Sequence, residues 1–189
     1  MRLSYQLLSM EQLAVWANKD FQSLNESIRT ILPIELEAFS WLAELRLRQL
    51  EQDENYANWS LRLIYLQDEV LNKIKIVGLI GFHSPPNPNY LKPIIYNAIE
   101  LGYHIIKSER RKGFASQAIQ DMMFLASQSQ VDYTVLSIAF ANEASLSLAK
   151  KLSFKHYDNP NLYIEKHESV FYKANNFSAT NTSPQHPQD

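Results

Sequence analysis

The chain has 189 residues, of which 46% are hydrophobic and 12% aromatic. This length and composition suit one packed globular domain rather than a disordered chain. The chain has no cysteine, which excludes disulfides, thiolate metal sites and a cysteine nucleophile, and its net charge of −2 argues against a nucleic-acid or anionic-membrane partner.

The first elements are predicted from hydrophobic spacing. The first 30 residues lack the basic start and apolar block of a signal peptide, and no apolar run approaches the roughly 18 residues needed to cross a bilayer, so we expect a cytoplasmic protein. Residues 3–8 alternate as a strand, and Ser9 is placed to cap a following helix. Loosely helical spacing predicts helices over residues 11–28 and 34–50.

The rest of the chain alternates strands and helices. Strands are predicted near 60–67 and 74–83, followed by a loop over 84–89, where prolines supply no ladder donors. The later elements are a strand, a helix, a strand, a helix and two closing strands, at 97–107, 113–128, 133–140, 143–152, 154–158 and 162–173. Short loops between the central strands allow only antiparallel neighbours, which predicts a mixed α/β protein whose sheet is not wholly parallel.

The domain organisation is predicted from the composition along the chain. Residues 1–174 are expected to form a single domain, and residues 175–189, rich in Asn, Ser, Thr, Pro and Gln, a disordered tail.

A cluster of cations lies between a predicted strand and a predicted helix, in the segment Glu109-Arg110-Arg111-Lys112-Gly113-Phe114-Ala115-Ser116. The first N–H groups of a helix lack partners within it, and the helix dipole favours anions there. Gly113 lets the backbone approach a bulky diphosphate, and Ala115 leaves the first turn uncrowded. The segment therefore predicts a phosphate-binding site, with a solvated basic turn as the alternative. It matches neither a nucleotide P-loop nor a Rossmann fingerprint.

The pattern Arg110-x-x-Gly113-x-Ala115 resembles the Gln/Arg-x-x-Gly-x-Gly/Ala motif with which the GNAT superfamily of N-acetyltransferases binds the CoA pyrophosphate. Segments 77–82, 99–103 and 142–154 resemble other parts of that family in the same order. The resemblance covers about residues 74–156 and is greatest to the branch of ribosomal-protein N-terminal acetyltransferases.

Two positions depart from the family pattern. Ser153 stands where the family usually has glycine. Ala149 replaces the tyrosine that protonates the leaving thiolate in many members, a tyrosine that the resembled branch commonly lacks. The resemblance therefore leaves the general acid unassigned.

The resemblance implies a GNAT fold, with six to seven mostly antiparallel strands and about four helices. It implies transfer of an acetyl group from acetyl-CoA, without a metal, to a primary amine of a small molecule or peptide N-terminus by direct attack. The alternatives are a non-catalytic CoA-binding or scaffold protein and an RNA-associated module, which the net charge of −2 disfavours. The protein is expected to be a monomer or homodimer.

The resemblance also assigns residues to the cofactor. The pyrophosphate would bind the backbone of residues 111–115 (Arg111, Lys112, Gly113, Phe114 and Ala115), with Arg110 and Arg111 as charge partners. The pantetheine arm would add like a strand beside His104, Ile105 and Ile106 through main-chain hydrogen bonds. Asn142 would reach the pantetheine, and capping of the next helix is its alternative or additional role.

Glu100 is the candidate general base. On its strand it shares a face with Ala98, Gly102 and His104, opposite the face of Ile99, Leu101, Tyr103 and Ile105. An unpaired carboxylate is costly to bury in an apolar strand, so we expect Glu100 to face a wet cleft or have a raised pKa. Either suits a base acting on an ammonium, and an ion pair with a nearby Arg or Lys is the alternative. Some family members carry a glutamate base near this point.

Other polar residues are open to two interpretations. Ser145 is a candidate acid or donor to the sulfur, or an ordinary first-turn residue of its helix. His104 is a possible second base or a structural histidine. His83 and Tyr90 line the acceptor side or lie in a surface loop. The acidic residues between positions 35 and 54 attract a cationic acceptor or form a solvated helix face.

Overall fold

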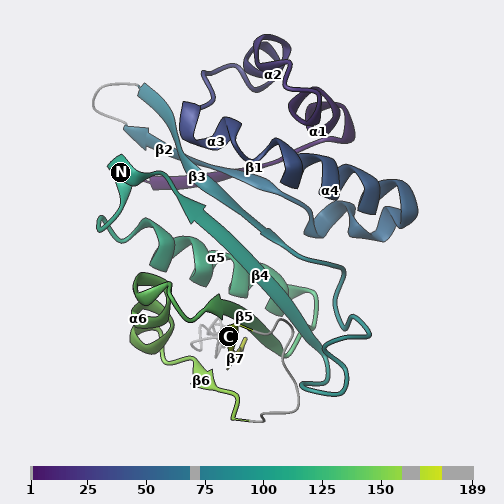
Figure 1. Ribbon diagram of the computed structural model, residues 1–189, viewed down its shortest axis with the longest axis vertical. Helices are drawn as coiled ribbons and strands as arrows, with labels where there is room; N and C mark the ends of the chain where they lie inside the picture. Colours follow the sequence, from purple (N-terminus) through teal and green to yellow (C-terminus); the bar gives the residue numbers. More distant parts are fainter. Residues whose placement is uncertain (1, 69–72, 159–166, 176–189) are drawn as a thin grey trace, which may run out of the picture.

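The computed structural model describes residues 2–68, 73–158 and 167–175 (Figure 1). In this part of the chain, seven strands form one sheet in the order β1-β2-β3-β4-β5-β7-β6. The strands are β1 (Arg2–Leu7), β2 (Arg62–Asp68), β3 (Lys73–Phe82), β4 (Ala98–Ile105), β5 (Tyr133–Ala139), β6 (Lys155–His156) and β7 (Glu168–Ala174). Only β4 and β5 pair in parallel, which confirms the predicted mixed α/β class with a mostly antiparallel sheet.

Helices cover both faces of the sheet (Figure 1). One group is α1 (Met10–Ala17), α2 (Phe21–Ile28), α3 (Ile34–Glu37), α4 (Ser40–Gln52) and the 3-10 helix η1 (Glu54–Trp59). Its buried side chains, such as Trp16 and Leu36, pack with Leu79 of β3. The second group is α5 (Phe114–Gln128) and α6 (Glu143–Lys151). There Ile119 of α5 packs with Leu101 of β4 in a separate core cluster.

Two predicted helices are each broken in the structure. The helix expected over 11–28 is interrupted because Lys19 has a φ of 60° and the Asp20 carboxylate accepts a hydrogen bond from Ser23 N, which starts α2. The helix expected over 34–50 is interrupted between α3 and α4. Ser9 caps α1 as predicted, since its Oγ accepts from Gln12 N at 3.2 Å.

The C-terminal elements differ from the expectation in length. The predicted strand 154–158 is reduced to the two residues of β6, and the last strand is β7. Residues 159–166 and 176–189, which include the start of the predicted last strand and nearly all of the predicted tail, lie outside the described residues. Among the described residues, no helix has the length and apolar character needed to cross a bilayer.

The parallel pair β4 and β5 creates an opening in the middle of the sheet. Their ladder joins only Ala98 to Tyr133, Ile99 to Thr134 and Glu100 to Val135. Beyond Glu100, β4 continues to Ile105 beside β3, while β5 continues beside β7. The second half of β4 therefore has one edge without a strand partner in the described structure, and this edge positions the candidate site.

Candidate active site

The open edge of β4 presents the main chain of alternate residues. On the other edge, His83 N donates to Glu100 O at 2.9 Å and Ile106 N donates to Val77 O at 3.0 Å. Because hydrogen-bonded pairs alternate in an antiparallel ladder, the even-numbered residues of β4 bond to β3 and the odd-numbered ones face the opening. Of the predicted pantetheine stretch 104–106, only Ile105 thus turns its main chain toward the gap.

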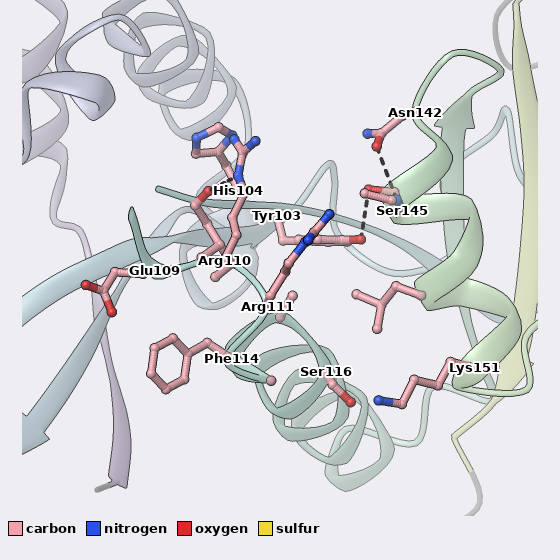
Figure 2. Close-up of a pocket in the computed structure, with 15 residues that line it drawn as sticks. Tyr103, His104, Glu109, Arg110, Arg111, Phe114, Ser116, Asn142, Ser145 and Lys151 are labelled. Carbon is pink, nitrogen blue, oxygen red and sulfur yellow. Dashed lines mark hydrogen bonds between the residues drawn. The ribbon is translucent and has the colours of Figure 1, made fainter. Parts of the chain in front are cut away.

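A cleft of about 520 Å³ lies along this opening, between the end of β4, the start of α5 and one side of α6 (Figure 2). This volume lies in the range of small-molecule sites. The lining includes most of the residues predicted to bind the cofactor, namely His104, Ile105, Arg110, Arg111, Gly113, Phe114, Ala115 and Asn142. Ser145 also lines it, whereas Ile106, Lys112 and Glu100 do not.

The N-terminus of α5 opens into the cleft. Gly113 is its N-cap, with a φ of 87°, and makes no side-chain cap hydrogen bond. The N–H groups of the first turn therefore have neither an intrahelical partner nor a capping side chain among the described residues. A Cβ at Gly113 would meet no atom within 4 Å, so the space above this residue is open. The local geometry suits an anionic group of a ligand.

The three cations before Gly113 have different surroundings. Arg110 donates from Nε to Ile105 O at 2.9 Å, and its guanidinium lies 3.5 Å from Glu35 Oε1. Lys112 Nζ lies 3.0 Å from Glu109 Oε2, and Lys112 does not line the cleft. Arg111 has a φ of 62°, and Figure 2 shows its side chain extending from the loop into the cleft. Arg111 is thus the cation best placed for a ligand in the cleft.

Glu35 on α3 connects the first group of helices to the end of β4. Its Oε2 accepts from Lys107 N at 2.8 Å, and its Oε1 lies 2.8 Å from His104 Nε2. The hydrogen bond from the Lys107 backbone, with His104 and Arg110, lowers the pKa of Glu35 despite the opposing effect of burial. The His104 ring also contacts Phe39, with centroids 4.7 Å apart. His104 is therefore held by two neighbours at the edge of the cleft.

Ser145 and Asn142 lie across the cleft on the first turn of α6. Asn142 Oδ1 accepts from Ser145 N at 3.1 Å, so the predicted capping role of Asn142 is confirmed, while its amide also lines the cleft. The Tyr103 hydroxyl donates to Ser145 Oγ at 3.0 Å and bridges β4 and α6 (Figure 2). Burial raises the pKa of Tyr103.

Some cleft residues had no individual role assigned to them from the sequence. They are Tyr103, Glu109, Ser116, Ala144, Leu148 and Lys151. Tyr103 was assigned only to the apolar face of its strand, and the gap that exposes it depends on the course of β5. Lys151 lies seven residues after Ala144 and three after Leu148, and this spacing along α6 could have indicated a cation on the cleft side of the helix.

Glu100 lies on the opposite face of the sheet from Tyr103 and is only 2% exposed. Its Oε2 accepts from the Tyr90 hydroxyl at 2.9 Å and lies 3.3 Å from His83 Nδ1. Burial raises the pKa of Glu100, but the hydrogen bond and charge of His83, with Tyr90, outweigh it and leave the pKa below the ordinary value. The expectation of a wet cleft or a raised pKa was therefore wrong, and the ionic partner is a histidine rather than Arg or Lys.

Comparison with known proteins identifies the fold and family. A family model described as "Acetyltransferase (GNAT) domain" matches residues 8–155. No curated protein sequence matches. Three solved structures with a similar fold are PaiA N-acetyltransferase from Thermoplasma acidophilum with coenzyme A, a putative ribosomal-protein-serine acetyltransferase from Vibrio cholerae, and a spermidine N-acetyltransferase chimera from Vibrio cholerae and hSSAT.

These likenesses extend over nearly the whole of both chains. The identities are 14%, 15% and 18%, and the TM-scores are 0.57, 0.58 and 0.54. The matches cover 92%, 92% and 93% of this chain and 99%, 94% and 96% of the solved chains. The fold predicted from the motif resemblance is thereby confirmed, and with the family match over residues 8–155 the chain belongs to the GNAT acetyltransferase family.

Proposed function

We propose that this acetyltransferase moves an acetyl group from acetyl-CoA to a primary amine by direct attack. The observation that carries the proposal is the open edge of β4 beside the uncapped start of α5. The pantetheine amides would pair with the exposed main chain of Ile105 and Tyr103, as an added strand. The pyrophosphate would accept hydrogen bonds from the backbone of residues 111–115, with Arg111 as its nearest cation.

Direct transfer fits the side chains around the cleft. The chain has no cysteine to carry an acetyl group, so the amine attacks the thioester carbonyl while both are held in line. We propose that Glu100 takes part in removing the amine proton. Ser145 donates a proton to the thiolate. Ala149 is fully buried and carries no proton donor, which leaves Ser145 as the hydroxyl on this part of α6 that lines the cleft.

The acceptor is proposed as a small-molecule amine or a peptide N-terminus. Two of the similar structures are named for spermidine and for a ribosomal-protein serine, both of which are acceptors with amino groups. In this chain, Phe39 and the exposed Trp41 stack beside His104 at the edge of the cleft, with their centroids 6.5 Å apart. This apolar surface suits an amine that also carries apolar carbon.

Calorimetric titration with acetyl-CoA tests the cofactor site. We expect wild type to bind and Gly113→Asp to lose binding, because the new carboxylate would lie where the pyrophosphate is proposed. Ser129→Asp, which adds the same charge at the other end of α5, is the matched control. Failure of folded wild type to bind would overturn the proposal.

Release of free CoA tests the transfer. Wild type is incubated with acetyl-CoA and a panel of primary amines, namely spermidine, phenylethylamine and a short peptide with a free N-terminus. Acetyl-CoA binding with amine-dependent CoA release would support the enzyme. Binding without CoA release for any amine would favour the non-catalytic CoA-binding alternative.

A further inference from the structure

His83 occupies a specific place beside the opening of the sheet. It directly follows β3, and its ring lies over Gly102 on β4, where a Cβ would come within 2.5 Å of His83 Nε2. Gly102 is two residues beyond Glu100, the last residue of β4 that pairs with β5. The imidazole therefore lies on the face of the first group of helices, next to the point where β4 and β5 separate.

The ring is oriented through Nδ1, while Nε2 is the ring atom nearest to Gly102. Nδ1 lies 3.3 Å from Glu100 Oε2, and the His83 side chain is 39% exposed while that of Glu100 is 3% exposed. A carboxylate beside Nδ1 favours the tautomer with the proton on Nδ1, so the lone pair is on Nε2. Among the described residues, Nε2 has no hydrogen-bond partner.

We propose that His83 is the general base that takes the proton from the acceptor amine, and that Glu100 acts through it as a positioning residue. This proposal rests on the proposed function and assigns its deprotonation step to particular atoms. Three observations support it: the Glu100–His83 pair, the exposure of the imidazole and the packing of its ring against Gly102.

Glu100 itself is poorly placed to contact an amine. It is 2% exposed, and its Oε2 is already shared by the Tyr90 hydroxyl and His83 Nδ1. An ammonium would have to displace one of these partners and enter a buried space. The imidazole is far more exposed than the carboxylate, at 39% against 3%, and the carboxylate stabilises the imidazolium that forms.

The backbone at His83 is fixed by helices on the same face. Gln49 Nε2 and Arg46 Nη1 on α4 donate to His83 O at 2.9 and 3.2 Å. The Tyr56 hydroxyl of η1 donates to Phe82 O at 2.6 Å. The titratable groups facing His83 are thus Glu100 from β4, Arg46 from α4, Tyr56 from η1 and Tyr90 from the loop before β4.

The proposed step balances as follows. The acceptor ammonium gives one proton to His83 Nε2 and becomes a neutral amine. Its nitrogen lone pair forms the C–N bond with the thioester carbonyl carbon, and the C–S bond breaks with its electron pair on sulfur. The second nitrogen proton passes to Ser145 Oγ as this hydroxyl gives its own proton to the thiolate, which regenerates the serine, and His83 returns its proton to water.

Matched glutamine variants test the assignment. With any amine of the panel that wild type acetylates, His83→Gln should lower kcat by about 10²- to 10⁴-fold, the usual contribution of a general base, and leave the Kd for acetyl-CoA unchanged. His156→Gln is the control, because His156 is also paired with a carboxylate, Asp158, but lies on β6 away from the cleft. It should keep the wild-type rate.

The pH profile separates a base from a structural histidine. Histidine side chains change charge between about pH 5 and 8, so the wild-type rate should fall on acidification through that range. His83→Gln should abolish this acid limb, whereas Glu100→Gln should retain it. Nitrogen NMR of the imidazole should show the Nδ1–H tautomer in wild type and a mixture of tautomers in Glu100→Gln.

The outcomes distinguish the two proposals. If wild type acetylates an amine and His83→Gln keeps its rate within about twofold, the base is not His83, whereas the transferase proposal stands. If Glu100→Gln abolishes the acid limb and His83→Gln preserves it, Glu100 is the base itself. If wild type binds acetyl-CoA and acetylates no amine, the proposed function fails and the assignment of His83 fails with it.

Discussion

The Tyr103 hydroxyl donates a hydrogen bond to Ser145 Oγ at 3.0 Å and so joins β4 to α6 across the opening of the sheet. Because Tyr103 is the donor, Ser145 Oγ is held in place while its own proton stays available for another acceptor. The thiolate of CoA would be such an acceptor at the proposed site. The pair thus offers a proton donor in a protein whose Ala149 cannot be one.

Removing the Tyr103 hydroxyl should slow the reaction without preventing acetyl-CoA binding. Loss of one orienting hydrogen bond of about 1.4 kcal/mol predicts a roughly tenfold fall in kcat for Tyr103→Phe. Ser145→Ala should cost more, and the double variant should be no slower than Ser145→Ala, because the two hydroxyls act as a unit. Tyr133→Phe on β5 is the control. Additive losses in the double variant would contradict the coupling.

Arg111 should contribute more than Arg110 to cofactor affinity. Arg110 is already bonded to Ile105 O and lies beside Glu35, whereas Arg111 extends into the cleft. We expect Arg111→Gln to weaken acetyl-CoA binding about tenfold or more in calorimetry, and Arg110→Gln to weaken it less. The exposed Arg48, paired with Glu44, provides the control Arg48→Gln. Equal losses for the two cleft arginines would show that Arg110 leaves Glu35 to bind the cofactor.

Gly113→Ala should weaken acetyl-CoA binding more than it lowers the stability of the fold. A Cβ there meets no protein atom within 4 Å, but the φ of 87° lies in the left-handed region. The variant should therefore fold with a loss of about 1–2 kcal/mol in stability, measured by urea unfolding. Acetyl-CoA binding should weaken by a larger free energy than that, because the methyl group fills the space beside the exposed N–H groups. Unchanged affinity would place the pyrophosphate elsewhere.

Local features of the site were predictable from the sequence. Alternation along β4 correctly separated Glu100 from Leu101, which packs in the core under α5. The glycine after three cations correctly indicated an open helix start, because that geometry depends on adjacent residues only. The order of motifs was sufficient to predict the family over the region that they cover.

Pairings between distant segments could not be predicted. The partners of Glu100 depend on the register of β3 against β4, which places His83 beside it. The contact of Arg110 with Glu35 joins residues 75 positions apart and requires the break between α3 and α4. Residue spacing alone gives neither a strand register nor the packing of a short helix. The ion pairs of Glu100 and Arg110 therefore could not be predicted from the sequence.

The Glu109 carboxylate should make stability depend on pH. It is bonded to Lys75 Nζ at 2.8 Å and to Lys112 Nζ at 3.0 Å. Burial raises the pKa of Glu109, but the hydrogen bonds and charges of the two lysines outweigh it, so the pKa in the folded protein is lowered. A carboxylate with a lowered pKa stabilises the fold above its unfolded pKa of about 4.3, and this contribution is lost as pH falls through the folded value.

We therefore expect the free energy of unfolding to fall more steeply on acidification below about pH 5 in wild type than in Glu109→Gln. At pH 7 the variant should be less stable by about 1 kcal/mol, since both lysines are half-exposed and the ion pairs are screened. Urea unfolding at a series of pH values measures both quantities, with the exposed Glu51→Gln as control. Parallel curves for wild type and Glu109→Gln would show that the two lysines contribute nothing to the stability of this loop.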